Sequence, residues 1–328
     1  MIVPTSDQDI DWLARHHEAL APKFRFSVSY TDGMANELMD KHSLYALCRQ
    51  AGIETPRSHT ARRDEILDLA DQVHYPCLVK PTRIDRIKQA MRGRKGFIAE
   101  SRTELTELSL VLPEGDTDWL VQEIVPGPES AISLCAMFVN QAGETSLAMT
   151  CQKLRQFPPG FGSASLVRTT EDDETLNQSM ELLSATRYRG IAATEFKRDP
   201  RDGKLKLIEI NPRPSLWFGI TSTAGMPFVL SHYLDLTGAN PDQNGRTKRN
   251  VEWRYHSRDL TSRFIYLKGS ASGLPPPSTK RTGSIDETVS AVFAADDMKP
   301  ALTDLTQSLK TMFARGITKL SPSSRRSS

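Results

Sequence analysis

The stretch at residues 194–213, TEFKRDPRDGKLKLIEINPR, constrains the fold more than any other part of the chain. An Asp-Pro and an Asp-Gly pair at its centre supply turn chemistry, and the flanking segments have the composition of strands. The stretch therefore predicts a β-hairpin with its loop at residues 200–204. In this register Glu195 lies directly opposite Glu209, and Asn211 shares their face. The other face carries the residues expected to pack into a core, which are Phe196, Ile208 and Ile210.

Two carboxylates that face each other across a hairpin repel, which costs stability unless a cation lies between them. Glu195, Glu209 and Asn211 offer only oxygen ligands. Such a set suits a hard cation such as Mg²⁺, which is usually bound together with substrate phosphates. A surface hairpin with solvated charges and a different register explains the same residues equally well, so the rest of the chain must decide.

Length, charge and cysteine content limit the classes of function. The chain has 328 residues, room for about two domains, and its 42 Lys+Arg and 40 Asp+Glu leave a net charge of only +2. This balance gives no attraction to nucleic acid or membranes, and no apolar run is long enough to span a bilayer. The four cysteines are widely spaced and are typical of packing thiols in a reducing compartment. We therefore expect a soluble, cytoplasmic protein without nucleic-acid or membrane partners.

A basic cluster occupies residues 82–95, between a short buried strand at 75–81 and a second strand at 96–99. Six cations crowd around one glycine, namely Arg83, Arg86, Lys88, Arg92, Arg94 and Lys95. Like charges in a loop are usually just solvated, whereas a mobile lid for polyanionic phosphate would have the same composition. Both interpretations stay open on these residues alone.

The other segments predict alternating helices, strands and loops. Helices are expected at residues 40–52, 101–113, 171–188, 228–236, 253–268 and 300–314. Strands are expected at 119–125, 131–139, 145–154 and 289–294, with a rigid Pro/Gly loop at 157–163. Residues 1–35 hold too few elements for a complete α/β domain.

Taken in order, these segments resemble the ATP-grasp fold. The resemblance covers about residues 40–235 and rests on a helix that starts with Asp-Lys and ends in AGIETP, then YPCLVKP, the basic lid, QEIVPG and IEINPR. Each motif alone is weak, and the ordered set is specific. Within this superfamily the chain is most similar to the carboxylate–amine ligases typified by bacterial D-aspartate ligase. That similarity rests on GRKG in the lid, KLRQFPPGFG and AVFAADDMKP.

The resemblance implies an α/β (α+β) chain with an ATP-grasp fold of two lobes. The implied parts are a shortened N-terminal α/β segment, a lid-bearing lobe, a metal-binding lobe, a C-terminal extension and a disordered tail, at residues 1–40, about 57–118, about 119–238, 239–320 and 321–328. The two lobes form the ATP-grasp unit at residues 41–238. Such ligases generally carry a complete N-terminal domain. A start inside a longer reading frame, a reduced domain and completion by a partner chain therefore remain alternatives.

The residues that the resemblance implies for ATP binding are Lys41, Lys80, Lys95, Gln122, Glu123, Ile124, Val125 and Glu129. Lysines would reach the phosphates, because an ammonium acts as a compact point charge. Glu123 and Val125 would bind adenine through backbone groups, and Glu129, or a neighbouring position, would hold the ribose. For Lys41 an exposed lysine at a helix start is the competing interpretation.

The same resemblance assigns the metal and the chemistry. Glu195, Glu209 and Asn211 would be the Mg²⁺ ligands, on the face already reached from the hairpin register. Lys153 and Arg155 are two residues apart, hence on one face of a strand, and would meet the γ-phosphate or the substrate carboxylate. Arg213 would stabilise the acyl phosphate and its developing charge.

The implied reaction joins a small-molecule carboxylate to an amine through an acyl phosphate, with release of ADP and phosphate. It would use ATP and two Mg²⁺ ions, or Mn²⁺ in their place, and the substrate would be amino-acid-like. Alternatives are an ATP-grasp carboxylase or kinase that stops at the carboxy or acyl phosphate, and a regulatory ATP-binding protein without turnover. The family habit favours a homodimer.

Overall fold

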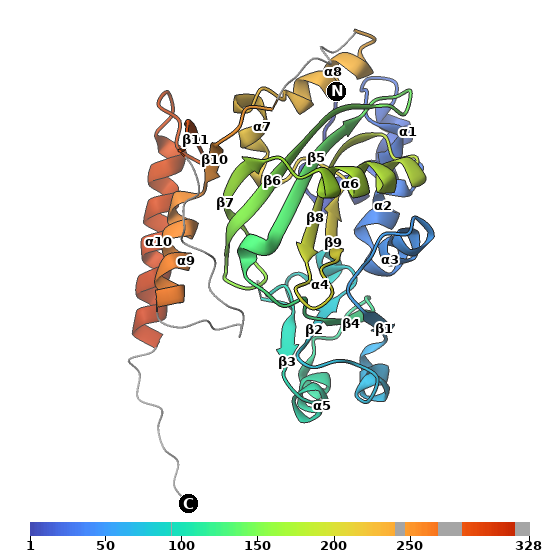
Figure 1. Ribbon diagram of the computed structural model, residues 1–328, viewed down its shortest axis with the longest axis vertical. Helices are drawn as coiled ribbons and strands as arrows, with labels where there is room; N and C mark the ends of the chain where they lie inside the picture. The colour runs from blue at the N-terminus through green and yellow to red at the C-terminus, as the bar shows by residue number, and fades with distance from the viewer. Residues whose placement is uncertain (93, 240–246, 268–283, 319–328) are drawn as a thin grey trace, which may run out of the picture.

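The computed structural model describes residues 1–92, 94–239, 247–267 and 284–318, with the backbone alone at positions 85, 309 and 311–318. Within these residues, two β-sheets and the helices that cover them form the molecule (Figure 1). The larger sheet lies in the centre, and the smaller one lies at one end of it. The mixed α/β class predicted from the sequence is confirmed. The domain boundaries remain predictions.

The large sheet has seven strands in the order β11-β10-β7-β6-β5-β8-β9. In chain order these are β5 Ile132–Val139, β6 Thr145–Phe157, β7 Ser163–Thr170, β8 Gly190–Arg198, β9 Leu205–Asn211, β10 Val251–Arg254 and β11 Glu287–Ser290. All neighbours are antiparallel except β10 and β11. Three of the six neighbouring pairs of this sheet, β5–β6, β6–β7 and β8–β9, are antiparallel strands that follow each other in the chain.

The small sheet has four strands in the order β1-β4-β2-β3, all antiparallel. They are β1 Ser58–Ala61, β2 Cys77–Pro81, β3 Phe97–Ala99 and β4 Trp119–Glu123. Their apolar residues pack with α5 Arg102–Val111 and a 3₁₀ segment at Arg63–Leu69 into a separate core. We call these elements the small lobe, and the seven-stranded sheet with its covering helices the large lobe. The small lobe carries the predicted lid, since residues 82–95 connect β2 to β3.

The remaining α-helices are α1 Asp7–Leu20, α2 Met34–Met39, α3 Lys41–Gln50, α4 Ile84–Ile87, α6 Asp173–Ala185, α7 Gly219–Thr223, α8 Phe228–Leu236, α9 His256–Leu267 and α10 Lys299–Thr318. Helices α1–α3 and α6 bury their apolar faces against one side of the large sheet. Helices α7 and α8 pack against the other side of this sheet, where their apolar residues meet those of β5, β6 and β10. A sheet covered on both faces explains why β5 is buried along almost its whole length.

The hairpin of β8 and β9 has the predicted register where it matters for the site. Glu195 pairs with Glu209, while Phe196 and Ile210 are buried in the core behind them. A β-bulge next to this pair shifts the outer ladder by one residue, so that Phe196 lies opposite Leu207 rather than Ile208. The prediction that Ile208 packs into the core is therefore wrong.

The C-terminal part begins differently from the prediction. Residues 253 and 254, expected at the start of a helix, belong to strand β10 at Val251–Arg254, and α9 starts only at His256. The strand predicted at residues 289–294 is β11, which starts two residues earlier and ends four residues earlier than predicted. The tail at residues 321–328 lies outside the described residues. Among the described helices, none is long and apolar enough to cross a bilayer.

Candidate active site

The two facing carboxylates lie at the far edge of the large sheet, on the last two strands. Glu195 on β8 pairs with Glu209 on β9, and Asn211 follows Glu209 in regular register and so shares its face. The predicted set is therefore on one face of one hairpin. Glu195 accepts a hydrogen bond from Lys153 Nζ at 2.5 Å, and the Lys153 side chain is only 5% exposed.

Lysines from both lobes surround this pair. Burial alone would raise the pKa of Glu209, but the charges of four lysines hold it well below its usual value; these are Lys41, Lys95, Lys80 and Lys153. Burial lowers the pKa of Lys80 to about 7, and the like charges of Lys41 and Lys95 act in the same direction. With Lys80 partly protonated at neutral pH, the four lysines carry between three and four positive charges against two carboxylates, which leaves an excess of positive charge. The cluster therefore has the electrostatic character of a polyanion site.

The bulge in β9 also positions Lys41. The ammonium of Lys41, in the first turn of α3, donates to the Ile208 carbonyl oxygen at 3.1 Å. The Tyr45 hydroxyl donates to the same oxygen at 3.4 Å and itself accepts from the Gln122 amide at 2.7 Å. These contacts tie α3, β4 and β9 together at the carboxylate pair. Lys41 is thus half-buried and bonded rather than an exposed lysine at a helix start.

Lys153 and Arg155 do not share a face, contrary to the prediction. Lys153 pairs with Val167 and Arg155 with Leu166, because the ladder between β6 and β7 shifts register at Leu154. Successive residues of a strand point to opposite faces. Lys153 accordingly reaches Glu195, whereas Arg155 makes hydrogen bonds of 2.6 and 3.3 Å to Asp259 of α9.

The end of β4 and the following residues form the predicted adenine segment, Gln122, Glu123, Ile124 and Val125. The Glu123 carboxylate is buried and accepts from the Arg57 N–H, from Arg201 at 3.0 Å and from Lys206 at 3.1 Å. These cations come from the β8–β9 hairpin and its turn, so Glu123 joins the small lobe to the large one.

Lys197 and Lys206 are functional candidates that the sequence reasoning missed. They pair directly across β8 and β9, and both are buried. Lys197 Nζ donates to the carbonyl oxygens of Val125 and Gly127 at 2.8 and 2.9 Å. Burial lowers the pKa of Lys197 to about 8, against the opposing influence of nearby carboxylates. In the predicted register Lys197 lies opposite Leu207, and only the bulge at Ile208 brings it opposite Lys206, so no sequence signal pointed to this pair.

Glu129, predicted to hold the ribose, is only 1% exposed. Its carboxylate accepts hydrogen bonds from the backbone N–H groups of Gln156 and Gly160, at 3.0 and 2.7 Å. It thereby anchors the Pro/Gly loop at residues 157–163. A ribose hydroxyl would have to share or displace one of these bonds. At the end of the same loop, Ser163 Oγ accepts from Lys95 at 3.3 Å, so the predicted lid contacts the large lobe.

Arg213, predicted to stabilise the acyl phosphate, lies two residues beyond Asn211, the last residue of β9. Its guanidinium bonds Asp7 of α1, with N–O distances of 2.7 and 2.8 Å. The side chain is 16% exposed. The structure thus places the carboxylate of Asp7, from helix α1, next to the predicted site residue Arg213.

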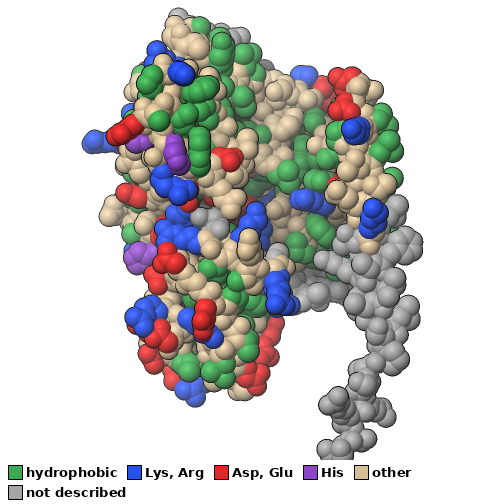
Figure 2. Space-filling model, turned by 180° about the vertical axis from the view of Figure 1, so that it is seen from behind, with side chains coloured by type: hydrophobic (Ala, Val, Ile, Leu, Met, Phe, Trp, Pro, Cys, Tyr) green, Lys and Arg blue, Asp and Glu red, His purple; other side chains and the backbone are tan. Residues whose placement is uncertain are grey.

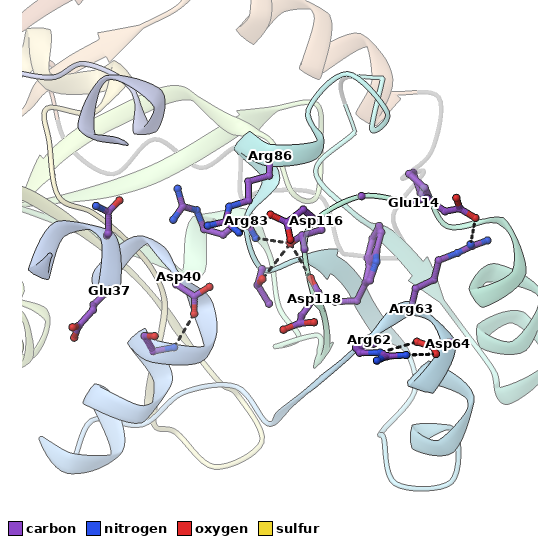
Figure 3. Close-up of a pocket in the computed structure, with 17 residues that line it drawn as sticks. Glu37, Asp40, Arg62, Arg63, Asp64, Arg83, Arg86, Glu114, Asp116 and Asp118 are labelled. Carbon is purple, nitrogen blue, oxygen red and sulfur yellow. Dashed lines mark hydrogen bonds and ion pairs between the residues drawn. The ribbon is translucent and has the colours of Figure 1, made fainter. Parts of the chain in front are cut away.

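A cavity of about 670 Å³ lies at the junction of the small lobe with α2 and α3. It is lined by Asp40 and Thr82, close neighbours in sequence of Lys41 and Lys80. Figure 3 shows Arg83 and Arg86 between Asp40 on one side and Asp116 on the other. Figure 2 shows Lys and Arg side chains gathered where the lower lobe meets the body of the molecule. None of the predicted site residues lines this cavity.

The donor set fits a hard divalent cation only in part. Within the described residues, no group of three His, Cys, Asp or Glu side chains converges as a metal site. The predicted ligands comprise two carboxylates and one amide, so further ligands would have to come from water and phosphate oxygens. Mg²⁺ sites beside nucleotides commonly have this composition, with one or two protein carboxylates. The excess of lysine charge around them fits the same interpretation, because phosphates would balance it.

No family model matches the chain. It is 24% identical over 224 residues to the D-aspartate ligase of Enterococcus faecium (strain Aus0004), covering 65% of this chain and 53% of that enzyme. It is 23% identical to the D-alanine–D-alanine ligase of Wolbachia pipientis subsp. Culex pipiens (strain wPip), covering 74% and 72%. It is 26% identical to the carbamoyl phosphate synthase large chain of Xylella fastidiosa (strain Temecula1 / ATCC 700964), covering 78% and 24%. The resemblance predicted from the motifs is confirmed by these relatives.

Solved structures agree on the fold. The N5-carboxyaminoimidazole synthase of Aspergillus clavatus, in complex with ADP and 5-aminoimidazole ribonucleotide, matches with a TM-score of 0.56, 14% identity and coverage of 72% of this chain and 60% of that one. The L-amino acid ligase of Bacillus licheniformis matches with a TM-score of 0.50 and 19% identity, covering 71% and 56%. The chain spans about half the length of the D-aspartate ligase that it matches.

Proposed function

We propose that this chain, a member of the ATP-grasp superfamily, is an ATP-dependent ligase that joins a carboxylate to an amine through an acyl phosphate. The observation that carries the proposal is the cluster at the lobe junction, where Lys80 and Lys95 of the small lobe approach Glu209 of the large lobe. Its excess of positive charge fits a triphosphate. The relatives named above include two enzymes that ligate amino acids, which supports an amino-acid-like substrate.

In this proposal the nucleotide lies between the two sheets. The Val125 carbonyl oxygen accepts from Lys197, which fixes the segment that would present backbone groups to adenine. Lys41, Lys80 and Lys95 would hold the phosphates. Phosphate charge would raise the pKa of Lys80 again, because it opposes the effect of burial and of the neighbouring ammonium groups.

Glu195, Glu209 and Asn211 would hold the metal ions, one or two, beside those phosphates. A bound Mg²⁺ would neutralise negative charge on the transferring phosphoryl group. Lys153 has a separate task, since its ammonium bonds Glu195 and so orients that carboxylate. Arg155 is not part of this machinery, because its guanidinium is bonded to Asp259.

The chemistry would proceed in two steps. An oxygen of the substrate carboxylate attacks the γ-phosphorus, the bond to the β-phosphate oxygen breaks, and ADP is the leaving group. The amine nitrogen then attacks the acyl carbon and loses a proton, and inorganic phosphate leaves. Arg213 would stabilise the charge that develops on the acyl phosphate. Lys95, bonded to Ser163 across the lobe junction, helps to exclude water that would hydrolyse the intermediate.

The proposal is tested by measuring ADP and phosphate with MgATP and pools of acids and amines, each omitted in turn. A ligase releases ADP only when both partners are present, and hydroxylamine in place of the amine traps the acyl phosphate as a hydroxamate. ADP release that depends on bicarbonate would identify a carboxylase instead. Binding of ATP without turnover over a broad pool would identify a regulatory protein.

Glu209→Ala tests the metal assignment. We expect loss of Mg²⁺-dependent turnover with the fold intact, because Glu209 would be a metal ligand facing the phosphates. Glu181→Gln, on the exposed face of α6, is the matched loss of a carboxylate and should leave turnover unchanged. Full activity of Glu209→Ala would refute the metal assignment.

A further inference from the structure

Helix α1 carries two carboxylates, Asp7 and Asp11, that neither its cap nor its core contacts require. The cap is made by Ser6 with Asp9, whose carboxylate accepts from the backbone of Thr5 and Ser6. The apolar face docks in the core through Ile10 and Leu13. Asp7 and Asp11 are four residues apart and therefore lie on one side of the helix.

These two carboxylates bond arginines of different lobes. Asp7 binds Arg213, which follows strand β9 of the large lobe, at 2.7 Å. Asp11 binds Arg83, which follows strand β2 of the small lobe, at 2.6 Å. The Arg83 side chain is 10% exposed, and its backbone N–H donates to Thr117 Oγ1. One helix thus bonds residues of both lobes.

The positions of the two arginines connect the bridge to the phosphate cluster. Arg83 is three residues beyond Lys80, and Arg213 is two residues beyond Asn211. The distance between the lobes at Asp7 and Asp11 therefore affects how far the lysines of the small lobe lie from the carboxylates of the large lobe. A misplacement of about 1 Å in such a site can lower the rate by roughly 10²-fold.

We propose that Asp7 and Asp11 are positioning residues of the active site. Asp11 holds Arg83 and with it the small lobe at the separation that lets one nucleotide contact lysines of both lobes. Asp7 holds the Arg213 guanidinium in the orientation used during phosphoryl transfer. The second part rests on the proposed ligase function, whereas the first requires only nucleotide binding.

The two parts predict different defects. Asp11→Asn weakens binding of the magnesium complex of a non-hydrolysable ATP analogue by about tenfold, because binding then has to order the lobes. Asp7→Asn leaves that affinity within about twofold and lowers kcat by about tenfold or more, because it acts on the transition state alone. Glu18→Gln, an exposed carboxylate of the same helix, is the matched control and changes neither.

A rescue experiment separates positioning from mere stability. Asp11→Arg combined with Arg83→Asp restores a salt bridge of reversed polarity, and we expect it to regain most of the analogue affinity that either single change loses. Asp7→Arg combined with Arg213→Asp should not regain kcat, because Arg213 itself would contact the reacting group. Asp7→Glu should recover part of kcat, since it keeps the charge. Thermal unfolding of every variant shows whether the fold is retained.

Calorimetry of analogue binding and steady-state kinetics on the full chain decide the outcome. Wild-type affinity in Asp11→Asn overturns the lobe-bridging role, and wild-type kcat in Asp7→Asn overturns the orienting role. A wild-type chain that binds the analogue but forms no product with any acid and amine would refute the ligase function instead. In that case the Asp11 measurement still stands, because it involves no turnover.

Discussion

The ion pair between Arg155 and Asp259 provides the sharpest test of the reassignment of Arg155 from catalysis to structure. The Arg155 and Asp259 side chains are 10% and 3% exposed, and two hydrogen bonds of 2.6 and 3.3 Å join them. Asp259 also lies 3.2 Å from Arg263 and 3.9 Å from Arg254. Asp259→Asn keeps the shape of the side chain but removes the negative charge that pairs with Arg155; Arg254 keeps a second partner in Glu252 at 3.2 Å.

The expected cost follows from the burial. Removing one partner of a buried pair leaves an uncompensated charge and costs about 3–5 kcal/mol. With an unfolding entropy of about 2.1 cal/mol/K per residue, the melting temperature of this chain should fall by about 4–7 °C. The exposed pair of Lys248 and Glu287 at 2.8 Å is the matched control, and Glu287→Gln should cost about 0–1 kcal/mol.

Calorimetric or spectroscopic melting, together with ADP release at a temperature where both proteins are folded, checks this prediction. We expect lower stability and nearly unchanged kcat for Asp259→Asn, and recovery of stability when Arg155 and Asp259 are both replaced by Met. A stable Asp259→Asn protein, combined with an Arg155→Gln protein that is folded but inactive, would refute the reasoning and return Arg155 to the catalytic group.

Three further predictions concern His232, Gly190 and Lys197. Burial lowers the pKa of His232 to about 4, below its value in the unfolded chain, so unfolding takes up protons between about pH 4 and 6.5. The stabilising contribution of the neutral His232 should be complete above pH 6.5, and the free energy of unfolding should be about 2 kcal/mol lower at pH 5. Denaturant titrations should find this loss in the wild-type protein and not in His232→Gln. Gly190 has φ +113°, and a Cβ there would lie 3.1 Å from Ser27 Oγ. Gly190→Ala should therefore lower the free energy of unfolding by about 1–3 kcal/mol in the same titrations. Gly238→Ala, at positive φ but with open space around the added Cβ, should show the smaller cost of backbone strain alone. Lys197→Met removes the donor to the carbonyl oxygens of Val125 and Gly127 and should weaken binding of the ATP analogue by about tenfold in calorimetry. Unchanged affinity would show that the predicted adenine segment needs no such support.

Local chemistry made the β8–β9 hairpin predictable. The Asp-Pro and Asp-Gly turn and the period of two placed Glu195 opposite Glu209, with Phe196 and Ile210 behind them, and the structure has this arrangement. The fold class followed from the order of motifs along the chain. Both inferences depend on interactions between residues close in sequence or on a linear pattern.

The bulges could not be predicted in this way. An extra residue at Ile208 or at Leu154 changes no composition and no obvious spacing, yet it changes the face to which the next side chain points; in β6 a second shift after Arg155 restores the original register. The bulge at Leu154 separates Lys153 from Arg155. The bulge in β9 lies at Ile208, whose carbonyl oxygen binds Lys41.

The sequence by itself determined the facing carboxylates, the buried strand that carries Lys80 and the general chemistry that they permit. Only the tertiary structure decided which cation each carboxylate would contact. Arg155 bonds Asp259, 104 positions away, and Arg213 bonds Asp7, 206 positions away. The spacing of charged residues along the chain does not indicate which of them will pair. An ion pair forms where burial of apolar residues brings two distant segments of the chain together.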